Sequence, residues 1–136
     1  MVRACHPDGR SARGDLCYPD SGYVACHEWQ PGPILAGKVG GLWGFLHGLG
    51  DYRVTFTLYP VPRWQVLTVN MAEVRRERLD NSCRVPRAWV RYSGELAGVL
   101  SALGGEGQYG ATVARNMAHA LSAIDVAAFR RRHGNA

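Results

Sequence analysis

The sequence predicts an α+β fold, and three observations lead to this class. Proline, glycine and aspartate recur at short intervals in residues 1–33, which is typical of loops. Apolar and polar residues alternate within 52–92, as in antiparallel strands, and apolar residues recur at helical spacing in 93–133. We therefore expect a single domain over 1–136 with an irregular N-terminal segment, a small antiparallel sheet of three to four strands, and C-terminal helices packed on one face.

Length and composition are those of an ordinary globular chain. The protein has 136 residues, of which 46% are hydrophobic and 20% are charged. No apolar run approaches the roughly 18 residues that span a bilayer, and no apolar segment follows Arg3 as it would in a signal peptide. We expect a cytoplasmic protein inside the host cell, with reduced cysteines and no membrane partner.

The first half of the chain offers few regular elements. Within the loop-rich segment, only Tyr23–Cys26 reads as a strand. Residues 34–50 combine six glycines with large apolar side chains, which predicts a buried turn followed by a short helix. The lysine and glycines at 38–41 lack the order of a P-loop, so we exclude that phosphate site.

Three strands are expected in the middle of the chain. Residues 52–59 alternate apolar and polar side chains and predict the first strand, and 64–70 predict the second. The proline-containing connection between them suggests an antiparallel hairpin. Asn70 then caps a short helix. Residues 84–92 predict a third strand, placed at a sheet edge because Pro86 interrupts it.

Two helices are expected after the sheet. Ser93 is the expected N-cap of a helix over 94–103, which ends at two glycines. A longer helix is expected over 111–130, where apolar residues recur every three to four positions.

Cysteine and histidine are concentrated near the N-terminus. Three of the four cysteines and two of the five histidines fall within the first 27 residues. These side chains bind zinc, and a metal would hold a loop-rich segment in place. The spacing lacks a Cys-x2-Cys pair, so buried free cysteines are the alternative. We expect no cofactor but leave zinc open, with these candidate ligands: Cys5, Cys17, Cys26 and His27, or His6 in place of His27.

An enzymatic alternative comes from the order of elements around residues 21–70. Gly22-Tyr-Val-Ala25, a short apolar helix and Tyr52-Arg-Val-Thr-Phe56 follow one another. This order resembles small ADP-ribosyltransferase-type proteins, which implies a cleft for a nicotinamide dinucleotide. The resemblance assigns ribose binding to His6, aromatic stacking to Tyr23 and the catalytic acid to Glu95 or Glu106.

Arginine and aromatic residues gather in the expected sheet. The chain has fifteen arginines and one lysine, and its net charge is +5. On a strand, Arg87, Trp89 and Arg91 share one face, which could stack on a partner and pair with its anions. The alternative is a solvated sheet face, and a GC-rich genome would also explain the arginine content. The candidate partner-binding residues are Arg53, Arg63, Trp64, Arg87, Trp89 and Arg91.

The sequence therefore favours a small binding protein without catalytic activity. Its arginine- and tryptophan-rich face would bind a polyanionic partner, either nucleic acid or an acidic protein surface. A chain of this size without a family motif is also typical of phage or mobile-element proteins that inhibit or scaffold a larger molecule. The alternative is a small enzyme with an N-terminal Cys/His site, zinc-dependent or ADP-ribosyltransferase-like.

Overall fold

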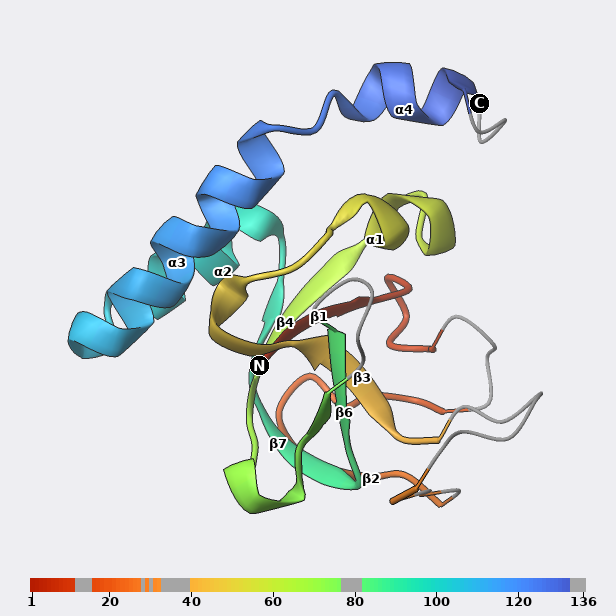
Figure 1. The fold of residues 1–136 in the computed structure, drawn as a ribbon, viewed down its shortest axis with the longest axis vertical. Helices are drawn as coiled ribbons and strands as arrows, with labels where there is room; N and C mark the ends of the chain where they lie inside the picture. Colours follow the sequence, from red (N-terminus) through yellow and green to blue (C-terminus); the bar gives the residue numbers. More distant parts are fainter. Residues whose placement is uncertain (12–15, 28, 30, 33–39, 77–81, 133–136) are drawn as a thin grey trace.

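The computed structural model describes residues 1–11, 16–27, 29, 31–32, 40–76 and 82–132. Within them, seven strands form one antiparallel sheet in the order β2-β7-β4-β1-β3-β6-β5 (Figure 1). The strands are β1 (Val2–Cys5), β2 (Gly22–Ala25), β3 (Leu42–Phe45), β4 (Arg63–Thr68), β5 (Arg75–Arg76), β6 (Ser82–Val85) and β7 (Arg87–Gly94). The helices are α1 (Arg53–Leu58), α2 (Leu96–Gly104), α3 (Gly107–Ser122) and α4 (Val126–Arg132), with 3-10 turns η1 (Leu46–Gly48) and η2 (Met71–Glu73).

The expected sheet of three to four strands is wrong, because the sheet has seven. The additional strands include β1 from the loop-rich segment and β3 from the glycine-rich segment, each only four residues long. Strands this short, next to glycine and proline, show too little alternation to be recognised from the sequence. Their consequence is large, because β1 lies at the centre of the sheet, between β4 and β3.

Two apolar cores lie against this sheet. The larger one joins the sheet to the helices, and its buried members include Val2, Phe56, Trp64, Val99 and Met117. The second core gathers other strand residues around Tyr18 of the N-terminal segment, and its buried members include Cys5, Leu42, Leu67, Val85 and Val90. Neighbouring residues of a strand point to opposite faces, so β1 supplies Ala4 to one core and Cys5 to the other.

The expected strand over 52–59 is helix α1. Its buried side chains are Tyr52, Thr55, Phe56 and Tyr59, which follow the spacing of one helix face. Val54 and Leu58 remain about half exposed. The apolar residues of this segment therefore fit both the two-residue period of a strand and the 3.6-residue period of a helix. Its β-branched and aromatic residues favoured the strand, which is the wrong prediction. The expected hairpin is absent for the same reason, since β4 pairs with β1 and β7.

The second expected strand is confirmed as β4, and the cap that follows it is confirmed in a shorter helix. The Asn70 side chain accepts a hydrogen bond of 3.0 Å from the Ala72 amide at the start of η2. In the glycine-rich segment, the described residues form β3 and η1 instead of an α-helix. His47 in η1 has a φ of 58°, a left-handed conformation that interrupts helical geometry.

Pro86 divides the expected third strand into β6 and β7. The edge position expected for it is wrong, because β7 lies between β2 and β4, and β6 lies between β3 and β5. Ser93 belongs to β7 and receives a hydrogen bond from Gln65, so it does not cap a helix. The expected long helix is two helices, and Asp125 accepts a hydrogen bond from the Ala128 amide at the start of α4.

No helix within the described ranges combines the length and the apolar character needed to cross a membrane.

Candidate functional site

Tyr23 of β2 and Trp89 of β7 form an exposed aromatic pair. The antiparallel register places the two residues directly opposite one another, with ring centroids 5.4 Å apart and ring planes inclined by 58°. Tyr23 is 54% exposed and Trp89 is 47% exposed, although Ala88 and Val90 beside Trp89 are buried. Large aromatic side chains left half exposed on a rigid sheet are typical of interaction surfaces.

Two arginines flank this pair, and both have carboxylate partners. Arg87 Nη2 lies 3.1 Å from Glu73 Oε2, which brings η2 next to the start of β7. Arg91 Nη2 lies 3.0 Å from Glu106 Oε1, between β7 and the start of α3. The ion pairs hold both guanidinium groups beside β7. We call Tyr23, Arg87, Trp89 and Arg91 the aromatic–arginine surface.

The expected alternation along β7 is interrupted at Arg91. Val66 of β4 pairs with Tyr92, whereas Leu67 pairs with Val90, so Arg91 has no direct partner on β4. Such a β-bulge adds one residue to a strand and turns the following side chains. It places Arg91 within reach of Glu106 while Tyr92 packs against the larger core.

The other three candidate residues lie elsewhere. Trp64 is only 3% exposed and packs in the larger core, so it cannot contact a partner directly. Arg53 lies on α1 and binds both carboxylate oxygens of Asp51, at 2.8 and 2.6 Å, which lowers the pKa of that carboxyl. Figure 1 places α1 near the opposite end of the molecule from β2 and β7.

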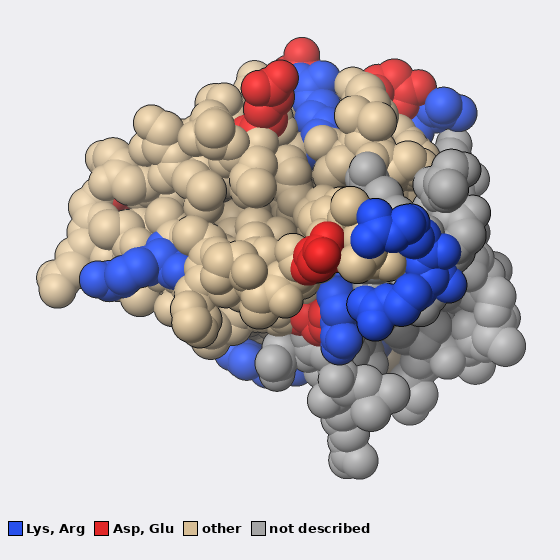
Figure 2. All heavy atoms as spheres, turned by 90° about the horizontal axis from the view of Figure 1, so that it is seen from above, with Lys and Arg blue, Asp and Glu red and all other residues tan. Residues whose placement is uncertain are grey.

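The end of the molecule that carries α1 and α4 has no continuous basic face among the described residues. Figure 2 looks onto this end and shows basic side chains in separate groups, most of them near acidic ones, with wide uncharged areas between. An extended site for a nucleic-acid backbone would need a continuous basic track. Among the described residues, the end of the molecule that carries α1 and Arg53 therefore shows no such track.

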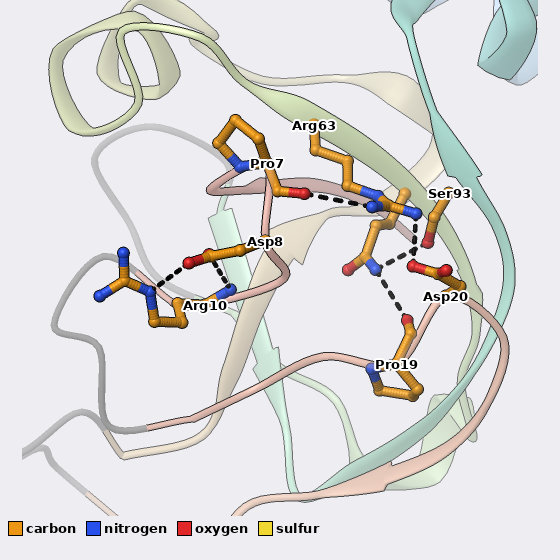
Figure 3. A network of polar contacts seen from close by, with 8 residues as sticks. Pro7, Asp8, Arg10, Pro19, Asp20, Arg63 and Ser93 are labelled. Carbon is orange, nitrogen blue, oxygen red and sulfur yellow. Dashed lines mark hydrogen bonds and ion pairs between the residues drawn. The ribbon is translucent and has the colours of Figure 1, made fainter.

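Arg63 holds the N-terminal segment against the sheet. It pairs with Asp20 and donates a hydrogen bond of 3.2 Å to the Pro7 carbonyl (Figure 3). From the same strand, the Gln65 side-chain amide donates to the Pro19 carbonyl at 3.2 Å and to Ser93 Oγ at 2.8 Å. These contacts fasten the N-terminal segment to β4 and β7.

Two of the candidate zinc ligands belong to one core, because Cys26 packs against the second core, in which Cys5 is buried. Cys5 is buried in the second core, where burial raises the pKa of its thiol, whereas Cys17 is exposed and Cys26 is half buried. His27 is exposed in the turn that follows β2. Within the part of the chain that the structure describes, which includes all four residues, no three Cys, His, Asp or Glu side chains are grouped as metal ligands.

The residues assigned by the ADP-ribosyltransferase resemblance are also separated. His6 follows β1 and packs edge-on against Tyr59, while Tyr23 lies on β2, three strand positions away across the sheet. At about 4.8 Å per strand, that separation is roughly 14 Å. Glu106 is engaged by Arg91, and the segment over 52–56 is helical where the resemblance requires a strand.

Sequence reasoning missed the neighbour of Trp89 and two buried arginines. Tyr23 reaches Trp89 only through the pairing of β2 with β7. Arg3 and Arg84 are both buried and donate to backbone carbonyls, and each lies over an aromatic ring. No local signal identifies them, because an arginine in a short strand is usually exposed.

Comparisons with known protein families, with curated proteins and with solved structures give no match for this chain.

Proposed function

We propose that the protein is a binding module whose aromatic–arginine surface docks an acidic protein partner. The observation that carries this proposal is the half-exposed pair of Tyr23 and Trp89, fixed in register on two neighbouring strands. Tyrosine, tryptophan and arginine are the residues that contribute most energy to protein interfaces. Their positions here are set by the sheet, so little side-chain entropy is lost on binding.

Charge supports an acidic partner. The net charge of +5 attracts anionic molecules, and Arg87 and Arg91 lie two residues to either side of Trp89 on β7. Carboxylates of a partner could share these guanidinium groups with Glu73 and Glu106, because arginine has five donors. An interface of this kind has an aromatic centre and a charged rim.

One feature favours a protein over nucleic acid. The rings of Tyr23 and Trp89 are inclined by 58° and offer no common plane for successive bases. An inhibitor or scaffold role, as expected for a phage or mobile-element protein, is compatible with this surface and stays a prediction.

Peptide display on the immobilised full chain tests the proposal. We expect selection to enrich acidic peptides with an apolar residue, and a synthetic copy of one to lose at least about tenfold in affinity with Trp89→Ala or Tyr23→Ala. Tyr109→Ala removes another exposed tyrosine, outside the surface, and should leave the affinity unchanged. Fluorescence anisotropy measures all four proteins.

The same assay with a mixed-sequence single-stranded oligonucleotide separates the two partner classes. If the oligonucleotide binds through Trp89 and no selected peptide does, the partner is nucleic acid and the proposal is wrong. If selected peptides bind Trp89→Ala as tightly as the parent, the aromatic–arginine surface is not the docking site.

A further inference from the structure

A pocket opens where β1 and β3 separate. Within the described residues, Val2 and Phe45 are the one Cα pair that joins these strands. Beyond that pair the two strands and α1 surround a pocket of about 200 Å³. The side chains of its wall are mostly apolar and include Ala4, Trp43, Phe45, Val54, Leu58 and Tyr59.

Arg3 is the charged residue in the wall of this pocket. It is only 6% exposed, and its Nη1 donates to the Tyr18 hydroxyl and, at 2.8 Å, to the Trp43 carbonyl of β3. Nη2 donates to the Ala4 carbonyl at 3.0 Å. Nε has no hydrogen-bond partner among the described residues. Arg3 thus bridges the separated strands and still keeps donor capacity along its Nε–Nη2 edge.

The charge of Arg3 has no anionic partner in the described part of the chain. No ion pair joins Arg3 to a carboxylate of the described residues. Its aromatic neighbour Tyr18 is neutral because burial raises the pKa of that hydroxyl to about 12. Burial also raises the pKa of the nearby Cys5 thiol. A buried guanidinium without a counter-ion is costly, and an anion that reaches it gains a strong, desolvated interaction.

We propose that this pocket binds a small monocarboxylate with an apolar body, and that its carboxylate pairs with Arg3. Arginine is the side chain best suited to hold a carboxylate, through two parallel donors. The apolar wall suits a ring or a short branched chain. A dry cavity of about 150 Å³ holds benzene, so a pocket of this volume matches a benzoate-sized ligand. This site is separate from the aromatic–arginine surface and does not depend on it.

Titration of the full chain with benzoate, followed by two-dimensional amide NMR, tests the proposal. We expect saturable shifts at residues of β1, β3 and α1. Benzamide has the same ring without the charge and should bind at least about tenfold more weakly. Equal binding of benzoate and benzamide would overturn the role of Arg3, and no saturable binding of benzoate would overturn the site.

Two tryptophan substitutions provide a matched comparison. Val54 lies at the rim of the pocket, so Val54→Trp should fill the entrance and weaken benzoate binding at least about tenfold. Val61 is exposed outside the pocket wall, so Val61→Trp should bind like the parent. Unchanged binding by Val54→Trp would contradict the assignment. Trp89→Ala should keep full benzoate affinity, whatever its effect on peptide binding.

Arg3→Lys tests the geometry of the charged group. Lysine keeps the charge but lacks the planar donor pair, so we expect benzoate affinity to fall at least about tenfold. Amide spectra establish whether this variant is folded. If Arg3→Lys is not folded, benzoate binding by Val54→Trp decides the test, because Val54 lies at the surface and its substitution leaves the core unchanged.

Discussion

At the scale of single residues, buried arginines take the place of contacts that short strands cannot make. Arg3 joins β1 to β3 through the Trp43 carbonyl, and Arg84 on β6 donates to the carbonyls of Gly40 and Gly32. The Arg3 guanidinium lies 3.7 Å from the centre of the Tyr18 ring. Because the Arg3 guanidinium packs on the neutral Tyr18 side chain, a change in the protonation of Tyr18 should change the free energy of unfolding.

Tyr18 predicts a loss of stability at alkaline pH. An unfolded tyrosine has a pKa of about 10, and burial raises the pKa of Tyr18 to about 12. Between these values the unfolded chain releases a proton that the native protein keeps. Tyr18 therefore makes its full contribution to the free energy of unfolding below pH 10. As the pH rises toward 12, this contribution falls by about 3 kcal/mol at most.

The variant Tyr18→Phe isolates this contribution. It removes the hydroxyl that accepts from Arg3 and should lower the free energy of unfolding by about 1–2 kcal/mol at neutral pH. Between pH 10 and 12, however, urea unfolding should show a shallower decline than in the parent. Parallel declines for parent and variant would show that Tyr18 is not the group responsible. Tyr23→Phe serves as the control with an exposed tyrosine.

At the scale of elements, α1 shows how one segment can carry two periods. Thr55 and Phe56 of α1 are buried together with the flanking Tyr52 and Tyr59, while Val54 and Leu58 lie partly in solvent. Phe56 and Tyr52 both contact the Trp64 ring, so the helical face is the one that meets the core. Tertiary packing decided between helix and strand here.

Alanine substitutions along α1 distinguish the two conformations. Phe56→Ala should reduce the free energy of unfolding by about 3–5 kcal/mol, because it empties a site in the larger core. Val54→Ala and Leu58→Ala should each cost less than about 1.5 kcal/mol, since these side chains are already about half exposed. Urea unfolding measures all three. Similar costs at the three positions would indicate a strand with one buried face.

At the scale of the whole molecule, α3 docks on the chain that follows β3 through a glycine. Gly48 has a φ of +74°, and a Cβ added there would clash with the Val113 carbonyl oxygen of α3. The side-chain amide of Asn116 donates to the His47 carbonyl at 3.0 Å at the same contact. This contact joins the C-terminal helices to the middle of the sheet.

Gly48→Ala should therefore destabilise the protein by about 1–3 kcal/mol or more, from strained backbone and overpacking together. Gly104 is the matched control, because a Cβ there meets nothing within 4 Å and the residue ends α2. Gly104→Ala should be neutral or stabilise by up to about 1 kcal/mol. Thermal unfolding compares both variants with the parent. Equal effects would mean that α3 does not rest on Gly48.

The sequence by itself determined features that depend on neighbouring residues. The strand around Val66, the helix cap at Asn70, the break at Pro86 and the exposed, alternate placement of Arg87 and Trp89 all follow from local spacing and backbone chemistry. These features need no information about distant partners. The sequence therefore places the candidate surface on the strand that becomes β7, while its second aromatic residue, Tyr23, comes from β2.

Only the tertiary structure decided which segments meet. The four-residue strand β1 becomes the centre of the sheet, Tyr23 becomes the neighbour of Trp89, and Trp64 turns from an expected surface residue into core. The N-terminal cysteines also differ in burial, since Cys5 is buried in the second core, Cys26 packs against that core, and Cys17 is exposed. Pairing and burial depend on contacts between residues far apart in the chain, and a local pattern carries no record of them.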